Sequence, residues 1–201
     1  ILVEDDRAVG VETVDGRRVT ARAVVSGAHV HTTLELLPDD TLPAQARRLL
    51  SRSRIGNGFG MIVRYAMEEL PDYLAQPSPA DGSPGPQHRA LQFICPSVEY
   101  LERAYGDYLG GRPAEEPALI AMTFSAVDPT LAPPGKQTLF LWGQYHPYRL
   151  ASGASWDEVA QREADRMLAT LAQYAPNVTG AVIDQLIETP AFLEETLGLR
   201  Q

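Results

Sequence analysis

The segment ALIAMTFSAVDPTLAPPGKQTLFLWGQY, residues 118–145, decides the fold of this 201-residue chain. It holds two apolar runs, 118–127 and 137–145, and each has the length of a strand. The residues between them, 128–135, contain three prolines and a glycine, a composition typical of a turn-rich connection. Because two strands joined so directly pair as antiparallel neighbours, we expect 137–145 to lie against 118–127.

Further strands and helices flank this segment. The apolar runs predict strands, and helical periodicity predicts a long helix at 156–174, which Ser155 caps. Its expected apolar stripe is Val159, Ala160, Ala164, Met167, Leu168 and Leu171. A second helix follows Ser97, with Val98, Leu101, Tyr105 and Leu109 on its expected apolar face. The remaining expected strands are 59–67, 91–95 and 178–188, and the short helices are 29–37, 42–50 and 190–197. This order predicts an α+β fold, a mostly antiparallel (mixed) sheet with helices packed on one face.

The first residues predict a separate β-hairpin. Segments 7–14 and 17–25 flank Asp15-Gly16, a dipeptide that favours a type I′ turn because both of its positions accept positive φ. The second arm loses its polar alternation over residues 23–28. We therefore expect this arm to continue into a sheet that is buried on both faces.

Composition excludes several classes of protein. The chain has 26 acidic and 17 basic residues and a net charge of −9, which disfavours non-specific nucleic-acid binding. No apolar run reaches the roughly 18–20 residues that a membrane-spanning helix needs. The single cysteine, Cys95, excludes an internal disulfide and fits a reducing compartment. Its apolar neighbours predict a buried strand and a structural thiol.

Few motifs of catalytic or binding chemistry are present. The glycine-rich residues 56–60 lead into an expected strand and not into a helix, so they do not predict a phosphate-binding loop. His29 and His31 with Asp39 resemble a metal set only loosely, and we expect no metal site. No catalytic residue is expected. Residues 71–87 hold five prolines and predict a long mobile surface loop. The start at Ile1, without a methionine, leads us to expect an internal fragment of a longer protein.

Three stretches resemble a known family. The first is the hairpin from Ala8 to Ala28, with GV-x-x-x-DG at 10–16 and AVVSGA at 23–28. The second is PSVEYLERAY at 96–105, and the third is VDPTLAPPGK at 127–136. Together they resemble the phytoene desaturase and phytoene dehydrogenase-related FAD-dependent oxidoreductases of the amine oxidase superfamily. That branch includes the pyridine nucleotide-disulphide oxidoreductase domain-containing protein 2 group.

The resemblance implies a domain organisation and a function. Residues 1–28 would be a hairpin and strand of an incomplete FAD-binding domain, and residues 29–201 a substrate-binding domain. The parent protein would be an FAD-dependent oxidoreductase that acts on a lipophilic substrate by hydride transfer to flavin. The cofactor FAD is not expected to bind this fragment, which would be inactive alone.

The resemblance also implies sites. Ser26, Gly27 and Ala28 are the expected cofactor-binding residues, although Gly27 and His29 replace the family's usual Asn and Asp. Substrate-cavity residues are expected on strands that flank the flavin, where alternate side chains face opposite ways. They are Phe59, Met61, Val63, Phe124, Phe140 and Trp142.

The sequence leaves two other interpretations open. The chain could be a stand-alone protein-interaction module, or it could be a scaffold that has lost flavin. The expected partners are a lipophilic small molecule and no nucleic acid, with a homodimer through an exposed sheet face as a further expectation. The expected location is cytoplasmic, and peripheral contact with a membrane is left open.

Overall fold

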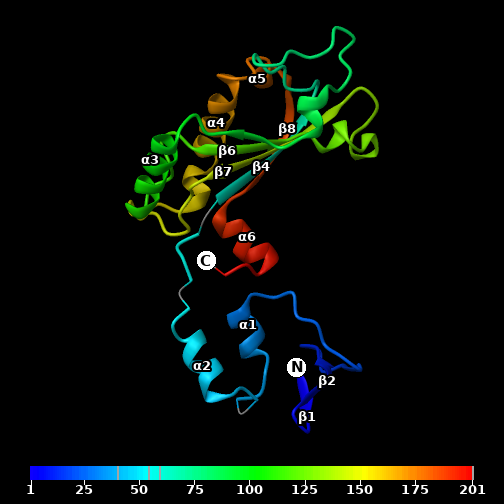
Figure 1. The fold of residues 1–201 in the computed structure, drawn as a ribbon, viewed down its shortest axis with the longest axis vertical. Coiled ribbons are helices and arrows are strands. Elements are labelled where there is room, and N and C mark those ends of the chain that lie inside the picture. The colour runs from blue at the N-terminus through cyan, green and yellow to red at the C-terminus, as the bar shows by residue number, and fades with distance from the viewer. Residues whose placement is uncertain (40, 54, 59, 201) are drawn as a thin grey trace. The chain divides into compact units, whose positions relative to one another are not determined.

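A computed structural model describes residues 1–39, 41–53, 55–58 and 60–200 and divides them into two compact units. One unit is residues 1–56 with 197–200, and the other is residues 57–196 (Figure 1). The chain therefore divides after Gly56. The assignment of residues 1–28 to a flavin domain and 29–201 to a substrate domain stays a prediction.

The first unit begins with three short antiparallel strands in the order β1-β2-β3. These are β1 (Leu2–Glu4), β2 (Arg7–Glu12) and β3 (Arg18–Thr20). Asp5 and Asp6 join β1 to β2 with φ angles of 46° and 59°. Positive φ at both positions of a two-residue turn defines type I′, so this turn lies at Asp5-Asp6.

The predicted hairpin is confirmed, but its predicted turn type is wrong. The loop between β2 and β3 is closed by hydrogen bonds from Thr13 N to Arg17 O and from Gly16 N to Thr13 O. Only Gly16 has positive φ, at 81°, whereas Asp15 does not. This geometry is a turn followed by a left-handed glycine, the usual three-residue hairpin loop.

The second arm of the hairpin is shorter than expected. Its strand ends at Thr20, and the last backbone bond to β2 runs from Ala21 N to Val9 O, 2.8 Å. Residues 21–29 are irregular and mostly exposed, so the expectation of a buried continuation is wrong. Two short helices follow as predicted, α1 (Val30–Glu35) and α2 (Ala44–Leu50).

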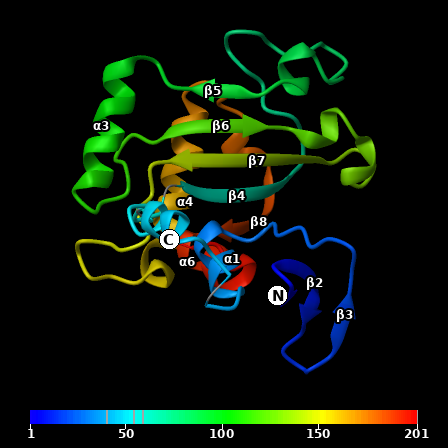
Figure 2. The same cartoon turned by 60° about the horizontal axis from the view of Figure 1, so that its bottom comes forward.

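The second unit is built on a five-stranded antiparallel sheet in the order β5-β6-β7-β4-β8, which Figure 2 shows face on. The predicted pairing of the two central apolar runs is confirmed, with Ala118 opposite Gln144 and Met122 opposite Phe140. The predicted α+β class is confirmed. The strands are β4 (Gly60–Met67), β5 (Gln92–Ile94), β6 (Ala118–Met122), β7 (Gln137–Gln144) and β8 (Val182–Glu188).

Two of these strands are at least four residues shorter than predicted. β6 ends at Met122, and residues 124–126 form a 3₁₀ turn. The buried Thr123 hydroxyl turns the chain there by donating to His88 O at 2.6 Å. The start of the last predicted strand, Val178–Ala181, is the short helix α5.

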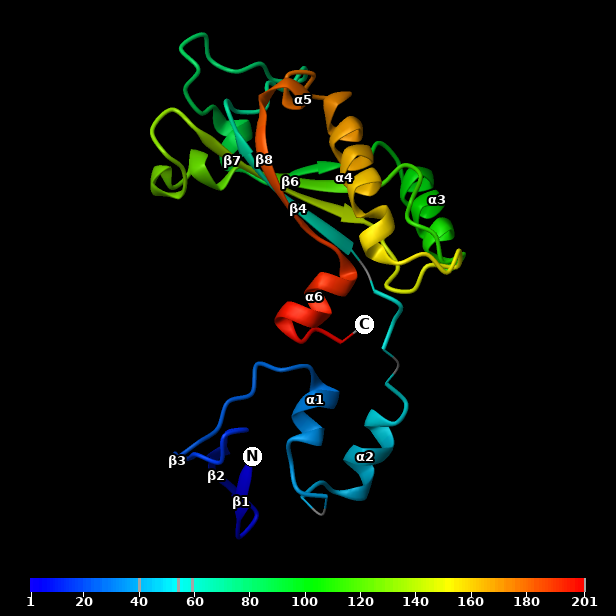
Figure 3. The same ribbon diagram turned by 180° about the vertical axis from the view of Figure 1, so that it is seen from behind.

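Helix α4 (Trp156–Ala172) covers one face of the sheet, behind the strands in Figure 2 and beside them in Figure 3. The predicted Ser155 cap is confirmed, because the Glu158 carboxylate accepts from Ser155 N at 2.7 Å. The predicted apolar stripe is confirmed at Val159, Ala164, Met167, Leu168 and Leu171, whereas Ala160 is half-buried outside the core cluster. The stripe packs against the sheet side chains Met61, Val63, Tyr65, Leu139 and Leu141 in one continuous core.

Helix α3 (Val98–Leu109) has its predicted cap but not its predicted buried face. Ser97 Oγ accepts from Tyr100 N at 3.2 Å. The buried side chains are Tyr100 and Ala104, whereas Val98 and Leu109 are more than two-thirds exposed. Tyr100 is fixed inside by its hydroxyl, which donates to Pro117 O at 3.1 Å. Apolar spacing alone therefore selected the wrong side of this helix.

The proline-rich segment is held at its ends by one histidine. His88, in the 3₁₀ turn Pro86–Arg89, is buried, and its Nδ1 accepts from Gly85 N at 3.0 Å. Its Nε2 lies 2.8 Å from Pro71 O and donates to it, because a carbonyl oxygen only accepts. The mobility predicted for residues 71–87 stays a prediction. Cys95 follows the end of β5 and is half-buried, so its predicted place inside a buried strand is wrong.

The last helix, α6 (Pro190–Leu197), begins and ends at the predicted residues. None of the described helices is both long enough and apolar enough to cross a membrane.

Candidate functional site: the open sheet face

The sheet of the second unit has a second face, opposite α4, which none of the described α-helices of that unit covers (Figure 2). We call it the open sheet face. Directly opposed residues on neighbouring strands share a face, so the pairing register defines its members. One row across the sheet is Phe93, Ile120, Trp142, Ile62 and Glu188, and the next is Met122, Phe140, Arg64 and Leu186.

This face is apolar and partly exposed. Phe93 and Leu186 are about half exposed, at 53% and 49%. Arg64 is exposed, while the apolar side chains between the edges are half-buried. On the covered face, the neighbouring residues Met61, Val63 and Leu141 are completely buried. Because successive residues of a strand point to opposite faces, the two environments alternate residue by residue.

The Trp142 indole lies against a glycine of the next strand. A Cβ atom at Gly60 would lie 2.1 Å from Trp142 Nε1, far inside a van der Waals contact. The glycine therefore gives the indole its place, and any side chain at residue 60 displaces it. Trp142 thus belongs to a preformed apolar surface.

One ion pair interrupts the apolar surface. Arg64 Nε donates to Glu188 Oε2 at 2.9 Å, across the diagonal between β4 and β8. The Arg64 guanidinium also lies 5.2 Å from the centroid of the Phe140 ring, within the range of a cation–π contact. Phe124 also contacts this ring, edge-on, with centroids 5.8 Å apart. The charged group is therefore held in place from two sides.

The chemistry of this face favours binding over covalent catalysis. Its side chains are aromatic and aliphatic, and its charged pair is already satisfied internally. Within the described part of the chain, no group of three or more His, Cys, Asp and Glu side chains is arranged to hold a metal ion. The face can therefore bury apolar ligand surface, at about 25 cal/mol per Å² removed from water.

The predicted cavity residues do not share one face. Phe140 and Trp142 lie on the open sheet face, and Phe124 lies at its edge, in the turn after β6. Met61 and Val63 need correction, because they are completely buried beneath α4 and cannot line a cavity on the other side. Phe59 lies outside the described residues. A role in substrate binding stays a prediction for Phe124, Phe140 and Trp142.

Sequence reasoning missed further members of the open sheet face, among them Ile62, Arg64, Ile120, Leu186 and Glu188. A signal was present in GMIVRYAM, residues 60–67. Arg64 and Ala66 have the same parity as Ile62, and a charged residue within an apolar strand marks the less buried side. The prediction instead took the odd-numbered, more uniformly apolar side.

The predicted cofactor residues lie in the first unit, in the exposed connection from β3 to α1. Ser26 Oγ is 2.7 Å from Thr33 Oγ1, and Thr33 Oγ1 donates to Ala28 O at 3.3 Å. These contacts fix a local bend, and a role of Ser26, Gly27 and Ala28 in cofactor binding stays a prediction. A dinucleotide pyrophosphate needs a glycine-rich turn at a helix N-terminus. In the described part of the chain, α1 has six residues and its cap His29 accepts from His31 N, which is not such a site.

The chain is similar over nearly its whole length to proteins with oxidoreductase names. The mouse (Mus musculus) "Pyridine nucleotide-disulfide oxidoreductase domain-containing protein 2" is 34% identical over 97% of this chain and 34% of its own length. A "Phytoene desaturase (lycopene-forming)" from Paracoccus sp. is 26% identical over 95% of this chain and 35% of its own. The chain resembles one part of these oxidoreductases. The family resemblance found in the sequence is thereby confirmed.

The solved structures agree on the fold. The crystal structure of an oxidoreductase from Methanosarcina mazei matches 93% of this chain and 35% of its own, with a TM-score of 0.50 and 18% identity. At that identity the match concerns the fold alone. No family model matches the chain. The chain spans about a third of the length of the curated relatives it matches.

Proposed function

We propose that this chain is the substrate-binding part of an FAD-dependent oxidoreductase that acts on a lipophilic substrate. FAD would be held mainly by other parts of the protein and would receive a hydride from the substrate. The observation that carries the proposal is the open sheet face, an apolar surface that α4 leaves uncovered. Similarity to relatives three times as long supports it, because such a surface then has a large neighbour to meet.

The proposed work of the chain is placement and exclusion of water. Trp142, Phe140 and Ile120 supply a flat apolar wall on which a hydrocarbon chain packs without a polar partner. Closing such a wall against the rest of the protein removes water from the site, which protects reactive intermediates. No proton transfer or covalent step is assigned to these side chains.

The Arg64–Glu188 pair sets a limit on the ligand. Because the pair joins Arg64 of the second row to Glu188 at the β8 end of the first row, it bounds the apolar wall toward β8. A ligand with an extended hydrocarbon portion fits between this pair and Phe93 at the other edge of the sheet. This arrangement supports a lipophilic substrate over a small polar one.

The first experiment measures whether a lipophilic molecule contacts Trp142. The chain has two tryptophans, Trp142 on the open sheet face and Trp156 in the core, where its Nε1 donates to Tyr148 O at 3.0 Å. A brominated fatty-acid methyl ester is the probe, because bromine quenches tryptophan fluorescence only at contact range. We expect saturable quenching in the wild-type chain and in Trp156→Phe, and little quenching in Trp142→Phe.

Equal quenching in both variants would place the ligand elsewhere and contradict the proposed binding surface.

The second experiment uses the full-length protein. Flavin bands in its absorption spectrum, bleached under anaerobic conditions by phytoene as the probe, would support the oxidoreductase. A full-length protein without flavin would instead favour the interaction module or the scaffold.

A further inference from the structure

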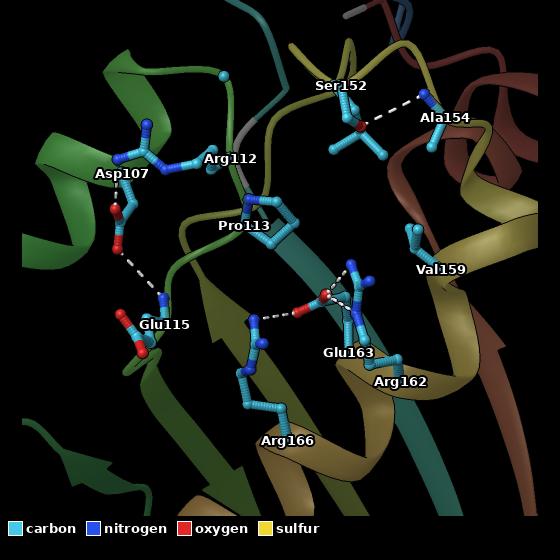
Figure 4. Close-up of a pocket in the computed structure, with 12 residues that line it drawn as sticks. Asp107, Arg112, Pro113, Glu115, Ser152, Ala154, Val159, Arg162, Glu163 and Arg166 are labelled. Atoms are coloured by element: carbon cyan, nitrogen blue, oxygen red, sulfur yellow. Dashed lines mark hydrogen bonds and ion pairs between the residues drawn. The ribbon is translucent and has the colours of Figure 1, made fainter.

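A second candidate site lies on the other side of the sheet, between α3 and α4. It is a hollow of about 520 Å³, within the range of roughly 300–1,000 Å³ that is usual for small-molecule sites. All of its residues belong to the second unit. We call it the α3–α4 pocket. Figure 4 shows it lined by α4, the end of α3, the loop 111–115 and the loop 150–154.

The α4 wall carries two arginines and one buried glutamate. The Glu163 side chain is completely buried, and its Oε1 accepts from Arg162 Nε at 2.8 Å. Its Oε2 accepts from Arg166 Nη1 at 2.7 Å, so both oxygens are occupied. The carboxylate therefore orients both guanidinium groups, and this wall keeps a net charge of +1.

The opposite wall carries two carboxylates and one arginine. Asp107 Oδ1 accepts from Arg112 Nη2 at 2.8 Å, and Asp107 Oδ2 accepts from Glu115 N at 3.1 Å. Among the described residues, the Glu115 carboxylate has no hydrogen-bond or ion-pair partner. This wall keeps a net charge of −1 and leaves one carboxylate free to accept.

The two walls face each other with opposite charge and do not pair directly. A guanidinium has five N–H donors, and the Arg166 group uses one of them on Glu163. Its remaining donors are available for oxygen ligands, in the fork geometry that suits carboxylate or phosphate. Val159, Leu150 and Pro113 line the space between the walls and suit a short aliphatic spacer.

We propose that the α3–α4 pocket binds a small zwitterion, with its carboxylate or phosphate on Arg166 and Arg162 and its ammonium on Glu115. The chain as a whole carries a net charge of −9, so the arginine wall is a local feature and not a general property of the surface. The proposal does not depend on the proposed oxidoreductase function. It rests only on the contacts within the second unit.

The test is a titration of the 201-residue chain with small-molecule probes, monitored by its amide and side-chain NMR signals. The probes are 4-aminobutyrate, butyrate and butylamine, which share a spacer and differ only in their charged ends. We expect saturable shifts in α4 and in loop 111–115 with 4-aminobutyrate. Butyrate and butylamine should each bind about tenfold more weakly, because each lacks one charge-assisted contact. 2-Aminoethyl phosphate then distinguishes a phosphate from a carboxylate at the arginine wall.

Two variants assign the ends of the ligand. Glu115→Gln removes an exposed carboxylate that has no side-chain partner. It should lower the affinity for 4-aminobutyrate about tenfold and leave the affinity for butyrate unchanged. Arg166→Gln should lower the affinity for 4-aminobutyrate and leave the affinity for butylamine unchanged. Because Arg166→Gln leaves the buried Glu163 with one partner, the more exposed Arg162→Gln is measured beside it, and circular dichroism checks that each variant folds.

Lys136→Gln is the control, because it removes one cation that pairs with Glu68 elsewhere in the unit. It should bind all three probes like the wild type. Absence of saturable binding of 4-aminobutyrate or 2-aminoethyl phosphate at millimolar concentration would overturn the proposal. Equal binding of 4-aminobutyrate by the wild type, Glu115→Gln and Arg162→Gln would overturn it as well.

Discussion

The two faces of the five-stranded sheet are made by the same strands and have opposite characters. Beneath α4, Met61, Val63 and Leu141 have no exposed surface. One residue away along the same strands, Ile62 and Trp142 keep part of their surface exposed. Both faces are apolar, so hydrophobicity alone does not separate them. The difference teaches that an apolar strand residue is a core residue only if another element covers its side of the sheet.

The largest expected difference between the faces is in stability. Leu141→Ala removes a completely buried side chain and should lower the free energy of unfolding by about 2–5 kcal/mol. Leu186→Ala makes the same chemical change on the open sheet face, where the side chain is 49% exposed, and should cost within about 1 kcal/mol. Urea denaturation of both variants measures this. Similar losses in the two would mean that the open sheet face is covered in the protein.

A second difference concerns pH, because a histidine that follows β7, His146, is buried on the covered side of the sheet. Burial lowers the pKa of His146 from 6.5 to about 4, and its Nδ1 donates to Gly143 O at 3.0 Å. The unfolded chain therefore binds a proton that the folded chain excludes between those values. The contribution of neutral His146 to the free energy of unfolding is fully present above about pH 6.5. It is lost as the pH falls, by about 2 kcal/mol between pH 7 and pH 5.

This pH effect is measured by unfolding at both pH values in wild type and His146→Gln. The variant should lack the His146 contribution and show a smaller loss on acidification. His29→Gln, which changes an exposed histidine of the first unit, is the control and should behave as the wild type does. An identical pH dependence in all three proteins would show that His146 titrates normally.

A third difference concerns association. In the isolated chain, the open sheet face should bind a hydrophobic dye and pair with a second copy, because a large apolar patch is rarely left in water. Trp142→Glu should reduce both dye fluorescence and the dimer fraction in sedimentation. Leu109→Ala, on the exposed side of α3, is the control. A wild-type monomer without dye binding would contradict the idea that this face needs a cover.

The smallest expected effect belongs to the charged pair of the open sheet face. Arg64→Met keeps the aliphatic stem but removes the guanidinium, which is half exposed beside Glu188. Water screens the pair on the half-exposed Arg64 side, but the Glu188 side chain is only 10% exposed and loses its partner, so the free energy of unfolding should fall by about 1 kcal/mol. A loss well above this value in thermal unfolding would mean that the pair is shielded from water, as it would be inside a closed cavity.

Part of this architecture could be predicted from the sequence because it is local. Apolar runs with turn residues between them predicted the antiparallel pairing of β6 with β7, and Ser155 and Ser97 predicted two helix starts. Family motifs predicted the oxidoreductase resemblance, which the relatives confirm. In each case the deciding interaction lies within a few residues or within a short spacing along the chain.

What the tertiary structure decided is which side of each element is covered. The sequence placed apolar residues on both sides of β4 and on two sides of α3, and it did not say where α4 or Pro117 would lie. The prediction therefore assigned Met61 and Val63 to the wrong face of the sheet, and it chose the wrong side of α3 as the buried one. The α3–α4 pocket brings together Asp107 and Glu163, which are 56 positions apart in the sequence. No local sequence pattern predicts it. Burial depends on which surfaces meet across such distances, and periodicity along one element carries no information about them.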